Sequence, residues 1–269
     1  MGYCQNHQKI KKKYKISKAK IYLDRKPILV INMTSSSKKI YDRLYQTFGP
    51  QYWWPMDHSH HQQHDSDPRF EVMIGAILTQ NTAWINVEKA IQNLKQHNML
   101  NPKAINEANN EILKQLINPS GFFNQKAKRL RIISEYILKL YHGNLNRFFE
   151  QSTVELRKEL LNLHGIGPET ADSILLYAGN KPVFVVDAYT KRLCRRFPLP
   201  PNPDSYDQIQ QYFQDQLSRK YRPNELVLIY NEYHALIVEL AKRFCKKQKP
   251  YCTDCPLNTL CSYPQKRSE

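Results

Sequence analysis

The stretch Leu163–Asp187, LHGIGPETADSILLYAGNKPVFVVD, decides the fold of this chain. It opens with the turn Gly165-Ile166-Gly167-Pro168, in which glycine tolerates a positive φ and lets successive backbone N–H groups point outward. Apolar residues from Ala171 to Ala178 then recur at helical spacing, which predicts a helix over Thr170–Tyr177. An amide-lined turn at the start of a helix is a favourable place for an anion. We therefore predict that this turn binds a phosphate.

A single acidic residue ends the same stretch. Asp187 follows the apolar run Val183–Val186. A carboxylate in such surroundings is usually paired, structural or catalytic, because an isolated buried charge is costly. The glycine turn alone is a weak signal, but the turn followed by Val-Asp at this distance is a specific pattern.

The composition favours an all-α protein with a basic surface that can bind a partner. The 269 residues are enough for one large or two modest domains, 41% of them are hydrophobic, and only 8 are glycine. Lys and Arg number 40 against 24 Asp and Glu, a net charge of +16. Residues 1–32 hold nine Lys and Arg and one Asp, so the rest of the chain stays basic without them. This charge indicates a nucleic-acid partner.

The chain shows no sign of membrane insertion or export. No apolar run approaches the roughly 20 residues of a membrane span, and no apolar core with a cleavage site follows the basic N-terminus. Four of the six Cys cluster near the C-terminus, a distribution typical of a metal site in a reducing compartment. We therefore expect a cytoplasmic, nucleoid-associated protein and no membrane partner.

The periodicity divides the chain into a series of helices. Residues 1–32 are predicted to be a basic extension or a mis-assigned start before Met33, and a first helix is predicted over Ser35–Phe48. The polar loop Asp57–Pro68 contains His58, His60, His61 and His64; a flexible insertion is favoured there over a metal site. Further helices are predicted over Phe70–Leu94 with a break at Gln80-Asn81-Thr82, Asn106–Ile117, Lys126–Tyr141, Thr153–Leu163, Tyr189–Phe197, Tyr206–Leu217 and Glu225–Phe244.

Four cysteines form the second distinctive pattern, Cys245-x6-Cys252-x2-Cys255-x5-Cys261. Four thiolates on one short loop can hold a [4Fe–4S] cluster or a structural zinc ion. Zinc sites more often show two C-x2-C pairs, and this loop has one, so the cluster is favoured. Three cations, Lys246, Lys247 and Lys249, lie between the first two cysteines, where we expect them to contact DNA phosphates.

These patterns together resemble a known family. The sequence L-x-G-x-G-x-x-x-A followed by Val-Asp resembles the helix-hairpin-helix and Gly-Pro-Asp signature of the endonuclease III superfamily of DNA glycosylases, and the cysteine spacing resembles the [4Fe–4S] loop of the same family. The resemblance implies an all-α fold of two lobes with a DNA-binding cleft between them. Residues 68–181 would form a helical barrel with the hairpin, and residues 33–67 plus 182–269 a second lobe with the cluster loop 245–261.

The resemblance also implies roles for individual residues. Asp187 would be the catalytic carboxylate, Gln80 the wedge that enters the duplex, and Trp53 or Trp54 the stacking platform of the base pocket. Phosphates would be bound by the hairpin residues Gly165, Ile166, Gly167, Glu169 and Thr170 and by Lys126. The implied partner is double-stranded DNA that contains a damaged base, bound by a monomer.

Two positions narrow the implied chemistry. Glu169 stands where bifunctional members carry the lysine that forms a Schiff base, so a monofunctional glycosylase is predicted. Gly75 stands where adenine-mismatch glycosylases carry a glutamate, which disfavours that group.

The strongest resemblance is to the 3-methyladenine glycosylases of type III, which implies an alkylated purine as the substrate. It is carried by Trp53-Trp54-Pro55, Ala76–Thr82, Pro119–Phe122, Asn124–Leu130, Gly165-Ile166-Gly167 and Val185-Val186-Asp187. The alternatives are a bifunctional endonuclease III-type glycosylase/AP lyase for oxidised pyrimidines and a non-catalytic DNA-binding iron–sulfur protein.

Overall fold

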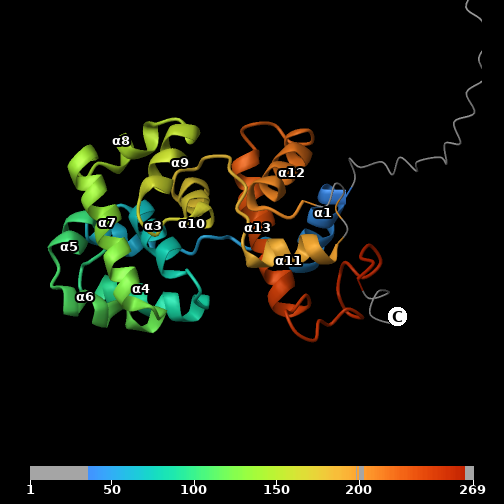
Figure 1. Ribbon diagram of the computed structural model, residues 1–269, viewed down its shortest axis with the longest axis horizontal. Helices are drawn as coiled ribbons and strands as arrows, with labels where there is room; N and C mark the ends of the chain where they lie inside the picture. Colours follow the sequence, from blue (N-terminus) through green and yellow to red (C-terminus); the bar gives the residue numbers. More distant parts are fainter. Residues whose placement is uncertain (1–35, 198, 200–202, 264–269) are drawn as a thin grey trace, which may run out of the picture. The chain divides into compact units, whose positions relative to one another are not determined.

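The protein is all-α, as predicted. The computed structural model describes residues 36–197, 199 and 203–263, and these contain helices and no β-strand. The basic extension predicted over residues 1–32 lies outside the described residues. The elements are α1 (Ser36–Phe48), α2 (His58–Gln63), α3 (Pro68–Leu78), α4 (Trp84–Gln96), α5 (Pro102–Glu107), α6 (Asn110–Ile117), η2 (Asn118–Ser120), α7 (Phe123–Tyr141), α8 (Leu145–Glu150), α9 (Thr153–Asn162), α10 (Pro168–Ser173), η3 (Ile174–Ala178), α11 (Ala188–Arg196), α12 (Tyr206–Ser218) and α13 (Leu226–Arg243) (Figure 1).

Helices α3 to α10 pack mainly on one another. α7 contacts α3, α5, α6 and α8, and α3 also contacts α4, α10 and η3. Nine of the eleven residues of α3, Phe70 to Leu78, are buried, which explains its nearly uninterrupted apolar sequence. Helices α1, α11, α12 and α13 form a second group, and α13 joins the two groups by packing on η3. The division at residues 68–181 stays a prediction. None of the described helices has the length and apolar character needed to cross a bilayer.

The segment that carries Asp187 is held rigidly in the core. Val183, Phe184, Val185 and Val186 are all buried, and the Phe184 ring stacks on a phenyl ring of α12 with the centroids 4.5 Å apart. Because this segment is extended, its backbone polar groups need partners outside a helix. Side chains of α12 provide them, since a glutamine there donates to Phe184 O at 2.7 Å and another accepts from Phe184 N at 3.0 Å.

A buried carboxylate connects the hairpin helix to its neighbours. Asp172 of α10 is fully buried. It accepts hydrogen bonds from Arg157 Nε of α9 and from Tyr206 Oη and Gln210 Nε2 of α12, each at 2.7 Å. A buried carboxylate with this many donors is compensated for the water it loses. Asp172 therefore fixes α10 relative to α9 and α12.

Most predicted helices are found, with differences at short elements. The predicted break at residues 80–82 separates α3 from α4, and Asn81 adopts a left-handed φ of 54° there. The predicted helix over 106–117 is two helices, because the side chain of Asn109 caps α6 by accepting from Glu111 N at 2.9 Å. Helix α8 was not predicted. The hairpin helix changes to a π-helical turn at Ile174–Ala178.

The prediction of a flexible insertion at residues 57–68 is wrong. Asp57 caps helix α2, and His61 on that helix is buried. His61 Nε2 lies 2.7 Å from Glu71 Oε2 and its Nδ1 lies 2.7 Å from Ser66 Oγ. Lys95 Nζ lies 3.1 Å from the same Glu71 oxygen. This buried cluster of opposite charges anchors α2 to α3 and α4.

Candidate active site

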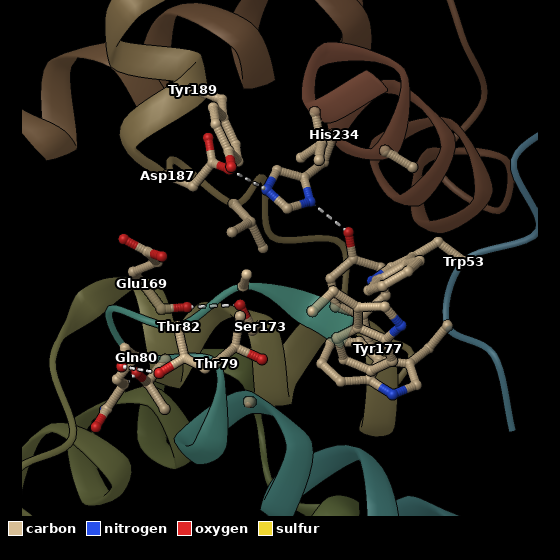
Figure 2. A pocket seen from close by; sticks show the side chains of 18 of the residues that line it. Trp53, Thr79, Gln80, Thr82, Glu169, Ser173, Tyr177, Asp187, Tyr189 and His234 are labelled. Atoms are coloured by element: carbon tan, nitrogen blue, oxygen red, sulfur yellow. Dashed lines mark hydrogen bonds and ion pairs between the residues drawn. The ribbon is translucent and has the colours of Figure 1, made fainter. Parts of the chain in front are cut away.

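One cavity of about 580 Å³ brings together the predicted catalytic, wedge and base-pocket residues with part of the hairpin (Figure 2). Its walls come from the segment after α1, the α3–α4 turn, the hairpin helix with η3, the start of α11 and one side of α13. Among its lining residues are the sequence-predicted Trp53, Trp54, Gln80, Glu169, Thr170 and Asp187. Lys126 and the lysines of the cysteine loop are not among them. A cavity of this volume is large enough for a nucleobase.

Asp187 is placed by the start of α11, which it caps. Its Oδ1 accepts a hydrogen bond from Thr190 N at 2.7 Å, and its Oδ2 lies 3.5 Å from His234 Nε2 of α13. Only 8% of the residue is exposed. Burial alone would raise the pKa of Asp187, but the interaction with His234 and the Thr190 N–H outweigh burial and lower it below its ordinary value. Asp187 is therefore ionised at neutral pH.

His234 was not singled out from the sequence, and neither was its second partner. Tyr177 Oη lies 2.5 Å from His234 Nδ1, and the π-helical turn carries Tyr177 to this position. Burial, together with the charge of Asp187, raises the pKa of Tyr177 well above its ordinary value, so the phenol keeps its proton. The two ring nitrogens of His234 thus face different groups, Nδ1 the Tyr177 phenol and Nε2 the Asp187 carboxylate. The sequence signal that could have found His234 was its position as a polar residue within the largely apolar helix predicted over 225–244.

The hairpin presents unpaired backbone amides. Gly165 has a φ of +86°, a conformation that favours glycine, and an added Cβ would collide with the side chain of Arg129. The N–H groups of Gly165, Gly167, Glu169 and Thr170 donate to no atom of the described chain, whereas Ile166 N donates to Leu163 O at 3.1 Å. Of the predicted amide donors, Ile166 is therefore already occupied.

The side chains of the hairpin and of the predicted wedge engage one another. Gln80 Nε2 donates to Gly165 O at 3.0 Å and to Thr170 Oγ1 at 2.9 Å, and Arg129 donates to Gln80 Oε1. Thr170 is buried, so its hydroxyl is not available to a phosphate. In this structure Gln80 braces the hairpin, while the neighbouring Asn81 is exposed at the tip of the turn. Entry of Gln80 into a duplex, which stays a prediction, requires these bonds to open.

Three tryptophans form an aromatic wall. Trp84 lies edge-on to both predicted platform residues, with centroid distances of 4.5 Å to Trp53 and 5.1 Å to Trp54. Tyr177 lies 5.5 Å from Trp54. Trp54 Nε1 has no hydrogen-bond partner among the described residues. The Trp54 ring packs directly over Gly75, where a larger residue such as glutamate would collide with it.

The prediction that Lys126 contacts the DNA backbone is wrong. Its side chain is fully buried, and Nζ donates to Leu78 O and Ser120 O at 2.7 Å and to Thr82 Oγ1 at 2.8 Å. Burial, with a smaller contribution from the charge of Arg129, lowers the pKa of Lys126 to about 8. Lys126 therefore ties the end of α3 and the α3–α4 turn to η2.

The four predicted cluster cysteines surround a single small cavity. Cys245, Cys252, Cys255 and Cys261 line it together with leucines of α11, α13 and the loop itself. No three Cys, His, Asp or Glu residues within the described ranges lie close enough to hold one metal ion. Burial and the charges of neighbouring thiols raise the pKa of Cys255 to about 11. Thiolates there need nearby positive charge, which the irons of a cluster supply. The four thiols face one common space.

The loop between the first two cysteines is exposed and braced by arginines. Lys246, Lys247 and Lys249 are all exposed. Arg196 donates to Lys246 O at 2.7 Å and to Lys247 O at 3.0 Å, and Arg192 Nε donates to Cys245 O at 2.8 Å. The exposed side chains of Lys247 and Lys249 can thus meet a polyanion while the backbone of the loop is held, and Lys246 Nζ lies over the Tyr251 ring, 4.5 Å from its centroid.

With this geometry in hand, comparison with known proteins identifies the family. Residues 74–219 match the model of the HhH-GPD superfamily base excision DNA repair proteins. The chain belongs to the HhH-GPD superfamily. A protein of Methanocaldococcus jannaschii assigned as a DNA repair glycosylase is 45% identical over 225 residues, which are 83% of this chain and 94% of the relative. Endonuclease III of Thermotoga maritima is 30% identical, with 76% of this chain and 87% of the relative covered.

Solved HhH-GPD structures share the fold. A 3-methyladenine DNA glycosylase of H. pylori, MagIII, bound to 1,N6-ethenoadenine has 32% identity and a TM-score of 0.64, and the match covers 76% of this chain and 96% of that one. A trapped endonuclease III–DNA covalent intermediate matches with a TM-score of 0.69 at 22% identity, over 88% and 99% of the two chains. The chain is accordingly a base excision repair DNA glycosylase, an enzyme that cleaves N-glycosyl bonds.

Proposed function

We propose that this glycosylase is monofunctional and releases an alkylated purine from duplex DNA, with Asp187 as its catalytic carboxylate. The observation that carries the proposal is the position of Asp187, an ionised carboxylate at the wall of a base-sized cavity that the hairpin also lines. A glycosylase acts on a nucleotide swung out of the duplex, and such a nucleotide brings its sugar to the cavity mouth and its base inside.

Asp187 would act on the sugar. Cleavage of the N-glycosyl bond leaves positive charge on the sugar ring, and a negative carboxylate stabilises this charge most strongly in a site that excludes water. His234 and the Thr190 N–H keep Asp187 ionised and fix its orientation. Backbone amides of the hairpin would hold a neighbouring phosphate, which positions the flipped nucleotide.

The aromatic wall supports a cationic base as the substrate. An alkylated purine such as 3-methyladenine carries positive charge, and a cation over an aromatic face gains about 0.5–2 kcal/mol. Trp53 and Trp54 provide such faces at the wall of the cavity. The name of the H. pylori neighbour, a 3-methyladenine DNA glycosylase, agrees with this assignment.

Glu169 supports monofunctional chemistry, because a carboxylate cannot form the imine that begins strand cleavage by a lyase. One observation favours the bifunctional alternative, since Lys242 of α13 also lines the cavity and could supply an amine. Borohydride reduction of the enzyme on damaged DNA tests this alternative. We expect no covalent adduct; an adduct that disappears in Lys242→Ala would establish the lyase.

We further propose that the four cysteines hold a [4Fe–4S] cluster and that Lys246, Lys247 and Lys249 bind DNA phosphates. The cluster, when bound, supplies iron–thiolate bonds that close the loop. Each lysine that neutralises a phosphate contributes about 0.9 to the slope of log K against log salt. Removing one lysine should lower the slope by about one, and an unchanged slope would contradict the assignment.

One assay tests the function as a whole. Purified protein is incubated with a panel of duplexes that each contain one lesion, with and without subsequent alkali. We expect a free alkylated purine and strand breaks only after alkali. Breaks without alkali, or release only of oxidised pyrimidines, would contradict the proposal.

A further inference from the structure

The cavity contains two carboxyl groups in contrasting environments. Asp187 and Glu169 both line it, Asp187 at the start of α11 and Glu169 on the first turn of α10, and Figure 2 shows both at the left of the view with Asp187 above Glu169. Asp187 is buried and receives the Thr190 amide, with His234 beside it. Glu169 is exposed at the rim, and its carboxyl group accepts no hydrogen bond from any described residue. Its oxygens are therefore free to contact a bound nucleotide.

The pKa of the Glu169 carboxyl group lies above its ordinary value. Desolvation of its carboxyl group by the surrounding protein, together with the charge of Asp187, raises the pKa of Glu169. The charges of His234 and Lys191 have a weaker, opposite effect. The pKa of Asp187 is shifted the other way. Two carboxyl groups whose environments push their pKa values apart form a typical acid and carboxylate pair for cleavage at a sugar.

We propose that Glu169 is a general acid that protonates the departing base, so that the site releases neutral purines as well as cationic ones. The inference rests on the proposed function, because it takes Asp187 and the cavity as the place of base release. It assigns a role to a side chain that the monofunctional assignment leaves without one. It also extends the substrate class to neutral purine lesions with a basic ring nitrogen.

The proposed step balances. The Glu169 carboxyl proton passes to a ring nitrogen of the purine while the bond between the purine and C1′ breaks, and the bonding electron pair leaves with the base. Asp187 stabilises the sugar cation that remains. Water then adds to C1′, and its proton returns to Glu169. The products are a free base and an abasic site, and both carboxyl groups regain their starting states.

A cationic base does not need this acid, which gives the proposal its test. Hypoxanthine and 7-methylguanine are both 6-oxopurines, but only the second is cationic when joined to the sugar. Single-turnover release of each from otherwise identical duplexes is measured for the wild type and for Glu169→Gln. Because general acid catalysis contributes about 10²–10⁴-fold, we expect hypoxanthine release to fall at least 100-fold in the variant. Release of 7-methylguanine should fall less than tenfold.

A matched control removes a different carboxylate from the same cavity. Glu239 lines the cavity from α13 and lies 3.6 Å from Arg243. Glu239→Gln should leave the ratio of the two release rates at its wild-type value. Affinity for a duplex with a tetrahydrofuran abasic analogue, together with the melting temperature, shows whether each variant is folded and binds DNA. The exposed position of Glu169 predicts no change in either for Glu169→Gln.

The outcomes separate this inference from the function on which it rests. If Glu169→Gln slows both bases equally, or if the wild type releases 7-methylguanine but not hypoxanthine, the general acid is refuted and the proposed function stands. If the wild type releases neither base nor any other alkylated purine, the proposed function itself fails. If only Asp187→Asn loses release of both bases, and only Glu169→Gln changes the ratio of the two release rates, the proposed function and the general acid are both supported.

Discussion

Replacing Lys126 by methionine tests whether this buried lysine stabilises the fold or binds DNA, as the exposed lysines of the cysteine loop are expected to do. Methionine keeps the length of the side chain and its packing but removes a fully buried ammonium that donates to three oxygens at 2.7–2.8 Å. Hydrogen bonds from a charged donor contribute about 1.5–3 kcal/mol each, so three contribute on the order of 4–9 kcal/mol. The pKa of about 8, against an ordinary 10.5, shows that burial disfavours the charge by about 3 kcal/mol, which the variant recovers.

The difference predicts that Lys126→Met destabilises the protein by about 1–6 kcal/mol. Chemical denaturation followed by circular dichroism measures this loss, and Lys247→Met is the matched control. That exposed lysine should change the free energy of unfolding by less than about 0.5 kcal/mol but lower the salt slope of DNA binding by about one. Lys126→Met should lower stability and leave the slope alone. A Lys126→Met protein of wild-type stability with a reduced slope would refute the buried brace and restore the phosphate contact.

Three further predictions concern the hairpin, the contacts of His234 with Tyr177 and Asp187, and the cysteine loop. Gly165→Ala should cost about 1–2 kcal/mol because of its left-handed φ and weaken DNA binding as Arg129 is displaced; wild-type affinity would show that the hairpin backbone does not depend on this glycine. Tyr177→Phe removes the hydrogen bond between Tyr177 Oη and His234 Nδ1, so His234 should be held less firmly beside Asp187 and the acid limb of the pH–rate profile for 7-methylguanine should move to higher pH; an unmoved limb would contradict a role for Tyr177 in positioning His234. Cys252→Ser should abolish the brown absorbance near ~400 nm of a [4Fe–4S] cluster, and an unchanged spectrum would contradict the ligand assignment.

Features set by local sequence were predictable. The break between α3 and α4, the hairpin and the extended run into Asp187 follow from turn residues and periodicity within a few positions of one another. The all-α fold followed from the same patterns.

Features set by tertiary contacts were not predictable. Lys126 looks like a surface lysine in the sequence, and only the meeting of α3 and η2 around it supplies the acceptors that bury it. In the sequence His61 belongs to a polar stretch, and only the fold brings its Nε2 to within 2.7 Å of Glu71 Oε2. The partnership of His234 with Asp187 depends on α13 crossing the start of α11, which no local pattern reports.

The most direct test of the account is the rate of 7-methylguanine release by Asp187→Asn under single turnover. The account predicts that release is abolished while the affinity for a duplex with an abasic analogue stays within a few fold of the wild-type value, because the amide still caps α11. Release at the wild-type rate by this variant would contradict the central claim that the Asp187 carboxylate drives cleavage of the N-glycosyl bond.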